Sequence, residues 1–142
     1  MIRPVGKVNP REILATALNI DLAPTMLAFA DVPIPPTMQG RDLSPLWTQA
    51  PLREPWRTDF LYEHYLSGLR NTSPGDEKDI PSSEGVRNER YTYLRYPRQS
   101  GWEQLFDRVA DANELKNIIH TAPAEFIEQL RKRTDELIAR NA

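Results

Sequence analysis

The spacing of apolar residues predicts a long amphipathic helix at the C-terminal end of the chain. After Pro123, the apolar positions share one helix face: Phe126, Ile127, Leu130, Leu137 and Ile138. Pro123 suits the first turn of a helix, where no backbone N–H is needed, and the acidic residues that follow favour the positive end of the helix dipole. We expect this helix to cover an apolar surface formed elsewhere in the chain.

The middle of the chain has the aromatic content and alternation of β-strands. Strands are predicted over residues 58–66, 84–88, 90–96 and 102–106. Residues 67–83 between the first two strands form a polar loop, longer than the roughly 12–15 residues that structureless loops usually reach. The predicted fold class is therefore α+β, with a small antiparallel sheet of about four strands packed by the C-terminal helix.

Proline divides the first third of the chain into short elements, since nine of the 13 prolines lie in the first 55 residues. A helix is predicted over residues 22–30, with Asp21 as its N-cap and Pro24 in its first turn. A second, brief helix is predicted over residues 43–47. Residues 11–17 fit either a helix or an extended segment.

Composition narrows the possible functions. The 142 residues include 18 Lys and Arg, 20 Asp and Glu, and no cysteine, for a formal charge of −2. The absence of cysteine excludes disulfides, thiolate metal sites and a cysteine nucleophile. Near-balanced charge argues against a general nucleic-acid or anionic-membrane binder. No apolar run approaches the roughly 20 residues of a membrane-spanning helix. No signal peptide is visible, and the compartment stays open.

The sequence lacks the common catalytic motifs. It contains no glycine-rich phosphate loop and no Gly-x-Ser-x-Gly elbow. Its two histidines, His64 and His120, are too far apart for a local metal-binding motif. A self-contained hydrolase or metalloenzyme is therefore not expected.

A series of short motifs nevertheless carries a family resemblance over nearly the whole chain. The motifs are N-I-D-L-A-P-T-M-L at 19–27, V-P-I-P at 32–35, M-Q-G-R-D-L-S-P-L at 38–46, F-L-Y-E-H-Y at 60–65, G-V-R at 85–87, E-R-Y-T-Y-L-R-Y at 89–96, E-Q-L-F-D at 103–107 and E-L-K-N at 114–117. In this order and spacing they resemble the C-terminal region of the sulfatase family. One departure is Asp31, at a position where the family usually has glycine.

The resemblance implies that the catalytic groups lie outside this sequence. Sulfatases carry a Cys/Ser-x-Pro-x-Arg motif, whose first residue becomes formylglycine, and calcium ligands in a large N-terminal α/β domain. Thr121-Ala-Pro-Ala-Glu125 has the proline spacing but lacks both the modifiable residue and the arginine. We expect no catalytic residue, metal ligand or cofactor in this chain, with calcium and formylglycine in the catalytic domain of a full-length relative.

By the same resemblance, residues 1–50 are the tail of the α/β domain and residues 51–142 are the C-terminal subdomain. The implied function is that of a C-terminal sulfatase fragment that shapes the substrate pocket and is inactive alone. The alternative is a stand-alone, non-catalytic module for binding or oligomerisation. Full-length sulfatases are often exported.

Four residues are candidates for contact with substrate: Glu63, His64, Arg70 and Arg87. His64 ends a predicted strand and can donate a hydrogen bond to an anionic substituent, although a lone histidine in an aromatic strand is more often structural. Arg70 lies in the long polar loop. Arg87 can meet an anion or pair with Glu63 or Glu84 across the sheet.

The expected partner of the site is a sulfated small molecule or glycan, bound only together with a catalytic domain. No nucleic-acid or membrane partner is expected. Without the parent sheet, an apolar face of the first helix would be exposed: Leu22, Met26, Leu27 and Phe29. Large exposed apolar patches favour association, so we expect a homo-oligomer or a rearrangement of residues 1–50.

Overall fold

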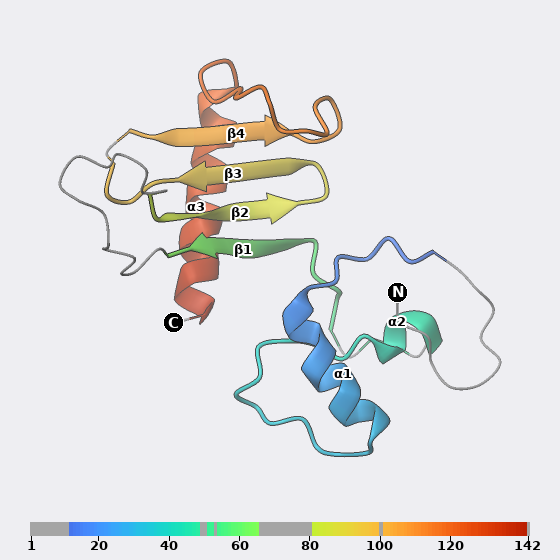
Figure 1. Ribbon diagram of the computed structural model, residues 1–142. Helices are drawn as coiled ribbons and strands as arrows, with labels where there is room; N and C mark the ends of the chain where they lie inside the picture. Colours follow the sequence, from blue (N-terminus) through green and yellow to red (C-terminus); the bar gives the residue numbers. More distant parts are fainter. Residues whose placement is uncertain (1–11, 49–50, 53, 66–80, 100, 142) are drawn as a thin grey trace, which may run out of the picture. The chain divides into compact units, whose positions relative to one another are not determined.

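The chain folds into two compact units, Met1–Arg57 and Thr58–Ala142. The computed structural model describes residues 12–48, 51–52, 54–65, 81–99 and 101–141 (Figure 1). The assignment of residues 1–50 to a larger catalytic domain stays a prediction.

The second unit is a four-stranded antiparallel sheet covered on one face by a helix. Its strands are β1 (Asp59–His64), β2 (Ser83–Asn88), β3 (Tyr91–Arg95) and β4 (Glu103–Asp107), and they lie side by side in chain order. Helix α3 (Ala124–Asn141) crosses one face of this sheet (Figure 1). The predicted α+β class, the four strands and the C-terminal helix are confirmed.

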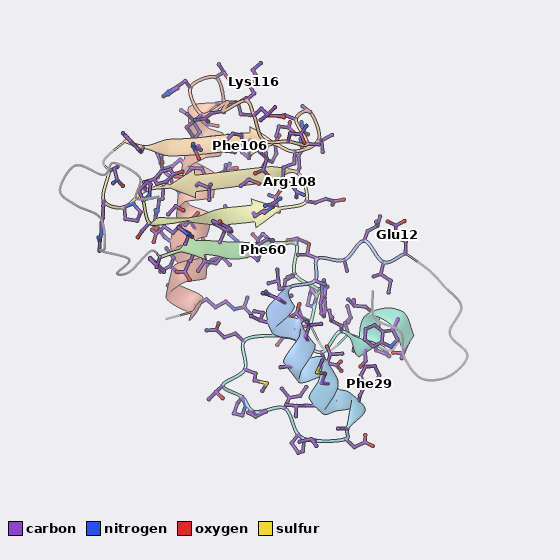
Figure 2. All side chains as sticks on the ribbon, viewed as in Figure 1. Glu12, Phe29, Phe60, Phe106, Arg108 and Lys116 are labelled. Carbon is purple, nitrogen blue, oxygen red and sulfur yellow. The ribbon has the colours of Figure 1, made fainter. Side chains whose placement is uncertain are left out.

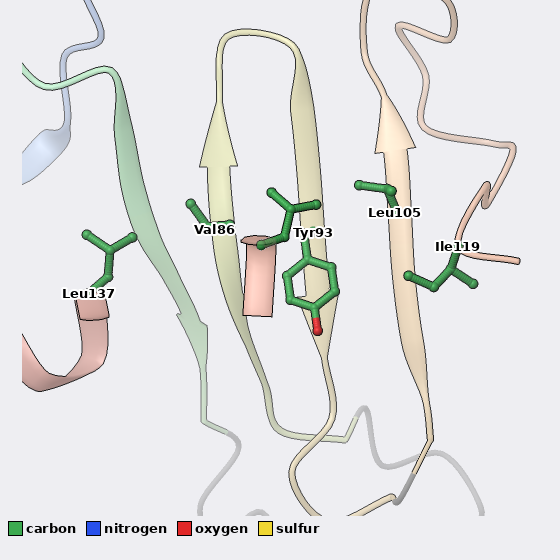
Figure 3. Close-up of a cluster of buried hydrophobic side chains, with 6 residues drawn as sticks. Val86, Tyr93, Leu105, Ile119 and Leu137 are labelled. Carbon is green, nitrogen blue, oxygen red and sulfur yellow. The ribbon is translucent and has the colours of Figure 1, made fainter. Parts of the chain in front are cut away.

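The core of the second unit is a cross-strand row of side chains that α3 covers. Pairing places Leu61 opposite Val86, Val86 opposite Tyr93, and Tyr93 opposite Leu105. Residues from beyond the sheet complete the buried cluster: Ile119, Leu130 and Leu137 (Figure 3). Because side chains alternate along a strand, this row fixes which face of each strand is turned to the helix.

Arginine–carboxylate pairs join α3 to the strands around this core. Arg131 lies 2.5 Å from Glu103, and Arg133 lies 2.6 Å from Asp59. The buried Tyr93 hydroxyl donates a hydrogen bond to Glu103, so that one carboxylate serves both the helix and the core. Burial, followed by the hydrogen bond to Glu103, raises the pKa of Tyr93, which keeps its hydroxyl protonated.

The outer edge of β4 is occupied by the E-L-K-N motif. The Asn117 side chain accepts a hydrogen bond from the Leu105 N–H at 2.9 Å, and the Ile118 N–H donates to the Leu105 carbonyl at 2.8 Å. Both backbone groups of Leu105 that face away from β3 are thus satisfied. The asparagine of this motif has a structural role.

The first unit contains two short helices, α1 (Leu22–Phe29) and α2 (Ser44–Thr48), with a 3₁₀ turn at Asn19–Asp21 before α1. Both predicted helices are confirmed, with boundaries shifted by one residue. Helix α1 is followed by Asp31 at φ 53°, the left-handed conformation that glycine adopts most readily after a helix. Within the described residues, no helix has the length and apolar character needed to cross a membrane.

The prediction that the Asp21 side chain caps α1 is wrong. Asp21 is fully buried, and its side chain makes no capping hydrogen bond to the helix. Its carboxylate instead accepts the backbone N–H groups of Leu18 and Arg41 and pairs with both terminal nitrogens of Arg57. Asp21 therefore joins three segments that lie far apart in the sequence.

Two further motif residues complete this junction. The Thr25 hydroxyl donates to the Asp21 carbonyl at 2.6 Å and accepts the Leu43 N–H at 3.0 Å. Gly40 is in close contact with the chain beside Asp21, since a Cβ there would lie 2.0 Å from the Ile20 carbonyl oxygen. Residues of the motifs at 19–27 and 38–46 thus contact one another and hold the first unit together.

Candidate functional site

His64 ends β1, opposite Ser83 of β2. Strand alternation places it, with Phe60 and Tyr62, on the sheet face opposite α3. Its Nδ1 atom is buried and has no hydrogen-bond partner within the described residues. A buried ring nitrogen without a partner is uncommon in folded proteins, so His64 remains a residue of interest.

Glu63 points to the other face of the sheet, since it alternates with His64 and shares the face of Leu61. It accepts a hydrogen bond from the Tyr65 hydroxyl at 3.0 Å, and that hydroxyl also lies 3.4 Å from Glu84. The hydrogen bond to Glu63 is the largest cause that raises the pKa of Tyr65. The structure therefore separates Glu63 from His64, although they are neighbours in the sequence.

Arg87 lies towards the other end of β2, opposite Phe60 of β1. Its expected alternative partners, Glu63 and Glu84, lie on the opposite face, and it pairs instead with Glu114 at 3.3 Å. The interpretation of Arg87 as a cross-sheet partner of Glu63 or Glu84 is thus wrong. Arg70 lies outside the described residues. The structure does not bring the three described candidates, Glu63, His64 and Arg87, into one site.

Sequence reasoning missed three residues of the cluster around Arg87: Thr92, Arg108 and Glu114. Glu114 accepts a hydrogen bond from the Thr92 hydroxyl at 2.9 Å and lies 3.4 Å from Arg108. Figure 2 places Arg108 at the sheet end where β4 finishes. Glu114 belongs to the E-L-K-N motif and Arg87 to the G-V-R motif. The presence of both motifs was the sequence signal that could have indicated this contact.

The described part of the first unit exposes most of its large apolar side chains. Leu43 is its one buried large apolar residue, whereas Leu22, Met26 and Phe29 of α1 are 41%, 67% and 52% exposed. Leu27 is half-buried. The exposed set continues beyond α1: Ile13, Leu14, Ile20, Val32, Ile34, Met38 and Leu52. The apolar face predicted for α1 is therefore largely exposed. The homo-oligomer expected to cover it stays a prediction.

Within the described residues, no group of three or more His, Cys, Asp or Glu side chains is arranged to hold a metal ion. Groups that could take part in recognition include His64 and the cluster of Arg87, Glu114 and Arg108.

Comparison with known proteins gives the chain a context. Residues 1–140 match the model of the family "N-sulphoglucosamine sulphohydrolase, C-terminal". Among curated proteins, an endo-4-O-sulfatase of Bacteroides thetaiotaomicron is 30% identical over 138 residues, covering 92% of this chain and 27% of the relative. An N-acetylglucosamine-6-O-sulfatase of the same organism is 28% identical, covering 76% of this chain and 18% of the relative.

A solved structure described in connection with glycosaminoglycan metabolism by Bacteroides thetaiotaomicron has a TM-score of 0.64 and 28% identity. The match covers 84% of this chain and 26% of that one. The chain thus spans about a quarter, or less, of the length of these relatives.

Proposed function

The chain belongs to the sulfatase family, as a C-terminal region of the N-sulphoglucosamine sulphohydrolase type, and we propose that it completes the substrate pocket of an enzyme that hydrolyses sulfate esters of sugars. The match to the family model over residues 1–140 is the observation that carries this proposal. Two relatives support the substrate class, since their names specify an endo-4-O-sulfatase and an N-acetylglucosamine-6-O-sulfatase.

We propose that this chain has no hydrolytic activity by itself. Formylglycine, formed from the first residue of a Cys/Ser-x-Pro-x-Arg motif, supplies the nucleophile in sulfatases, and calcium offsets charge on the sulfate. The sequence has no cysteine and no Ser-x-Pro-x-Arg motif. Its own contribution is to bind and orient the substrate.

In this proposal His64 is the residue that reaches the substrate. It lies at a strand end, on the sheet face away from α3, with an unpaired Nδ1. A neutral imidazole has one donor and one acceptor nitrogen, both suited to sugar hydroxyls, and the donor suits a sulfate oxygen. Glu63 and Arg87 are weaker candidates, because each already has a partner within the chain.

The exposed apolar residues of the first unit support a second candidate function, a stand-alone module that assembles with itself. Leu22, Met26 and Phe29 offer a surface that either a catalytic α/β domain or another copy of the chain would bury. Reading the coding sequence upstream of Met1 separates the two. An in-frame Cys/Ser-x-Pro-x-Arg segment favours the sulfatase enzyme, and a stop codon favours the module.

Hydrolysis assays test the lack of activity directly. The purified 142-residue chain is expected to release no product from an aryl sulfate. A chimera in which this chain replaces the matching C-terminal part of the endo-4-O-sulfatase is expected to hydrolyse sulfate esters. Activity of the chain alone would contradict the proposal, and so would a chimera that is folded by circular dichroism, carries formylglycine and is inactive.

Substitution of His64 tests its role in the same chimera. His64→Ala is expected to lower kcat/KM by about tenfold, because it removes a hydrogen bond to the substrate. A tenfold change corresponds to a loss of about 1.4 kcal/mol of transition-state binding. His120→Ala is the matched control, since His120 is exposed in the turn before α3, and it is expected to leave kcat/KM unchanged. A His64→Ala value within about twofold of the parent would remove His64 from the pocket.

A further inference from the structure

One hydroxyl and two guanidinium groups converge on a single carboxylate oxygen, Glu114 Oε1, at one end of the sheet. The Thr92 hydroxyl lies 2.9 Å from Glu114 Oε1, a terminal nitrogen of Arg87 lies 3.3 Å from it, and Nε of Arg108 lies 3.4 Å from it. No described residue donates a hydrogen bond to the second carboxylate oxygen of Glu114. Convergence of guanidinium groups and a hydroxyl is the arrangement that recognises oxyanions.

This cluster carries more positive than negative charge. Every other arginine in a described ion pair has at least one carboxylate to itself, whereas Arg87 and Arg108 share Glu114. Their distances to Glu114 are also the longest of the described ion pairs; that of Arg131 to Glu103, for comparison, is 2.5 Å. Glu114 is therefore a loose partner that leaves one positive charge uncompensated.

The Arg87 side chain donates no hydrogen bond to another described residue. This side chain is 32% exposed, and within the described residues its contact with Glu114 is an ion pair that is not aligned as a hydrogen bond. Arg108 also donates to the Asn88 carbonyl at 3.1 Å, which fixes its position beside the β2–β3 turn. A guanidinium has five N–H donors, and a partly buried one needs acceptors.

The backbone at Glu114 is in a conformation that costs energy. Its φ is 54°, in the left-handed region, which is unfavourable for a residue with a side chain. An unfavourable conformation that delivers a carboxylate to two arginines is compatible with a segment that releases them when a better anion is present. The Glu114 side chain is 27% exposed, so solvent reaches the cluster.

We propose that Arg87, Arg108 and Thr92 form a binding site for an external oxyanion, a sulfate or carboxylate group, for which the Glu114 carboxylate is the internal competitor. The anion accepts hydrogen bonds from the free N–H groups of Arg87 and neutralises the excess charge. This inference goes beyond the proposed function, since it needs only the residues of this chain and no catalytic domain.

Titration of the ¹⁵N-labelled chain with sodium sulfate, at constant ionic strength set by sodium chloride, tests the site by NMR. Saturable shifts are expected at the Nε–Hε signals of Arg87 and Arg108 and at the Thr92 amide. Glu114→Gln keeps an acceptor for Thr92 but removes the competing charge, so the sulfate Kd is expected to fall about tenfold. Sodium acetate, titrated in parallel, distinguishes a preference for sulfate from one for carboxylate.

Controls keep the result specific to these arginines. Arg87→Gln and, separately, Arg108→Gln are expected to abolish saturation, whereas Arg87→Lys retains weaker binding. Arg90→Gln is the matched control, because Arg90 in the neighbouring turn has its own partner in Asp107, and its sulfate Kd is expected to stay unchanged. An unchanged Kd in Glu114→Gln, or saturation that persists in folded Arg87→Gln, overturns the proposal.

Discussion

Replacement of Asp21 by alanine is expected to unfold the first unit. Removing one partner of a buried ion pair costs about 3–5 kcal/mol, because the other charge is left without compensation. Here the loss also leaves the N–H groups of Leu18 and Arg41 without their acceptor. The first unit has one buried large apolar residue, Leu43, among its described residues, so little apolar burial offsets this loss.

Urea denaturation followed by tryptophan fluorescence measures this effect. A Trp102→Phe background restricts the signal to Trp47 and Trp56 of the first unit. Glu12→Ala is the control, because Glu12 is exposed, and its effect on the free energy of unfolding is expected to stay within about 0.5 kcal/mol. A loss below about 1 kcal/mol in Asp21→Ala would mean that the junction does not hold this unit together.

The same carboxylate makes the first unit sensitive to acid. Burial by itself raises the pKa of Asp21, but hydrogen bonds from Arg57, Arg41 and Leu18 outweigh it and hold the pKa below its ordinary value. A carboxyl group whose pKa is lowered by folding stabilises the protein above its unfolded-state pKa. This stabilisation is lost as the pH falls through the lower pKa of the folded state, and Asp21→Ala is expected to lack this component of the pH dependence.

Gly85→Ala is expected to disrupt the sheet of the second unit. A Cβ at Gly85 would lie 1.9 Å from the Tyr93 carbonyl oxygen and 2.9 Å from the Leu94 Cα, so β2 and β3 must move apart. Overpacking typically costs about 1–3 kcal/mol, and we expect the upper end or more because both atoms belong to the backbone. The free energy of unfolding, followed by far-ultraviolet circular dichroism, measures the loss.

Glu89→Ala is the control for the sheet variant. Glu89 is exposed in the turn between β2 and β3, and its replacement is expected to change stability by less than about 0.5 kcal/mol. If Gly85→Ala and Glu89→Ala unfold at the same urea concentration, the close approach at Gly85 does not constrain the sheet.

Most of the secondary structure could be predicted from the sequence because its signals are local. The aromatic strands and the apolar face of α3 depend on residues a few positions apart, and all of them are present. The role of Asp21 was not predictable in this way, since its partners Arg41 and Arg57 lie 20 and 36 positions away. A capping role, which uses only the adjacent turn, was the local explanation that tertiary contacts replaced.

The candidate site shows the same limit. Glu63 and His64 are both candidates from the sequence, yet strand alternation places them on opposite faces of the sheet. The partner of Arg87 was missed because Glu114 comes from a connection beyond β4. Sequence patterns identified the arginine as a candidate but could not reveal the carboxylate that shares it.

The contacts of Asn117 and Ile118 with Leu105 have a consequence for self-association. An open sheet edge is a template on which another extended chain can pair and begin an aggregate. At β4 the outward backbone groups of Leu105 are already taken, so a foreign strand would first have to displace this segment. Growth of the sheet by strand addition is therefore impeded at β4.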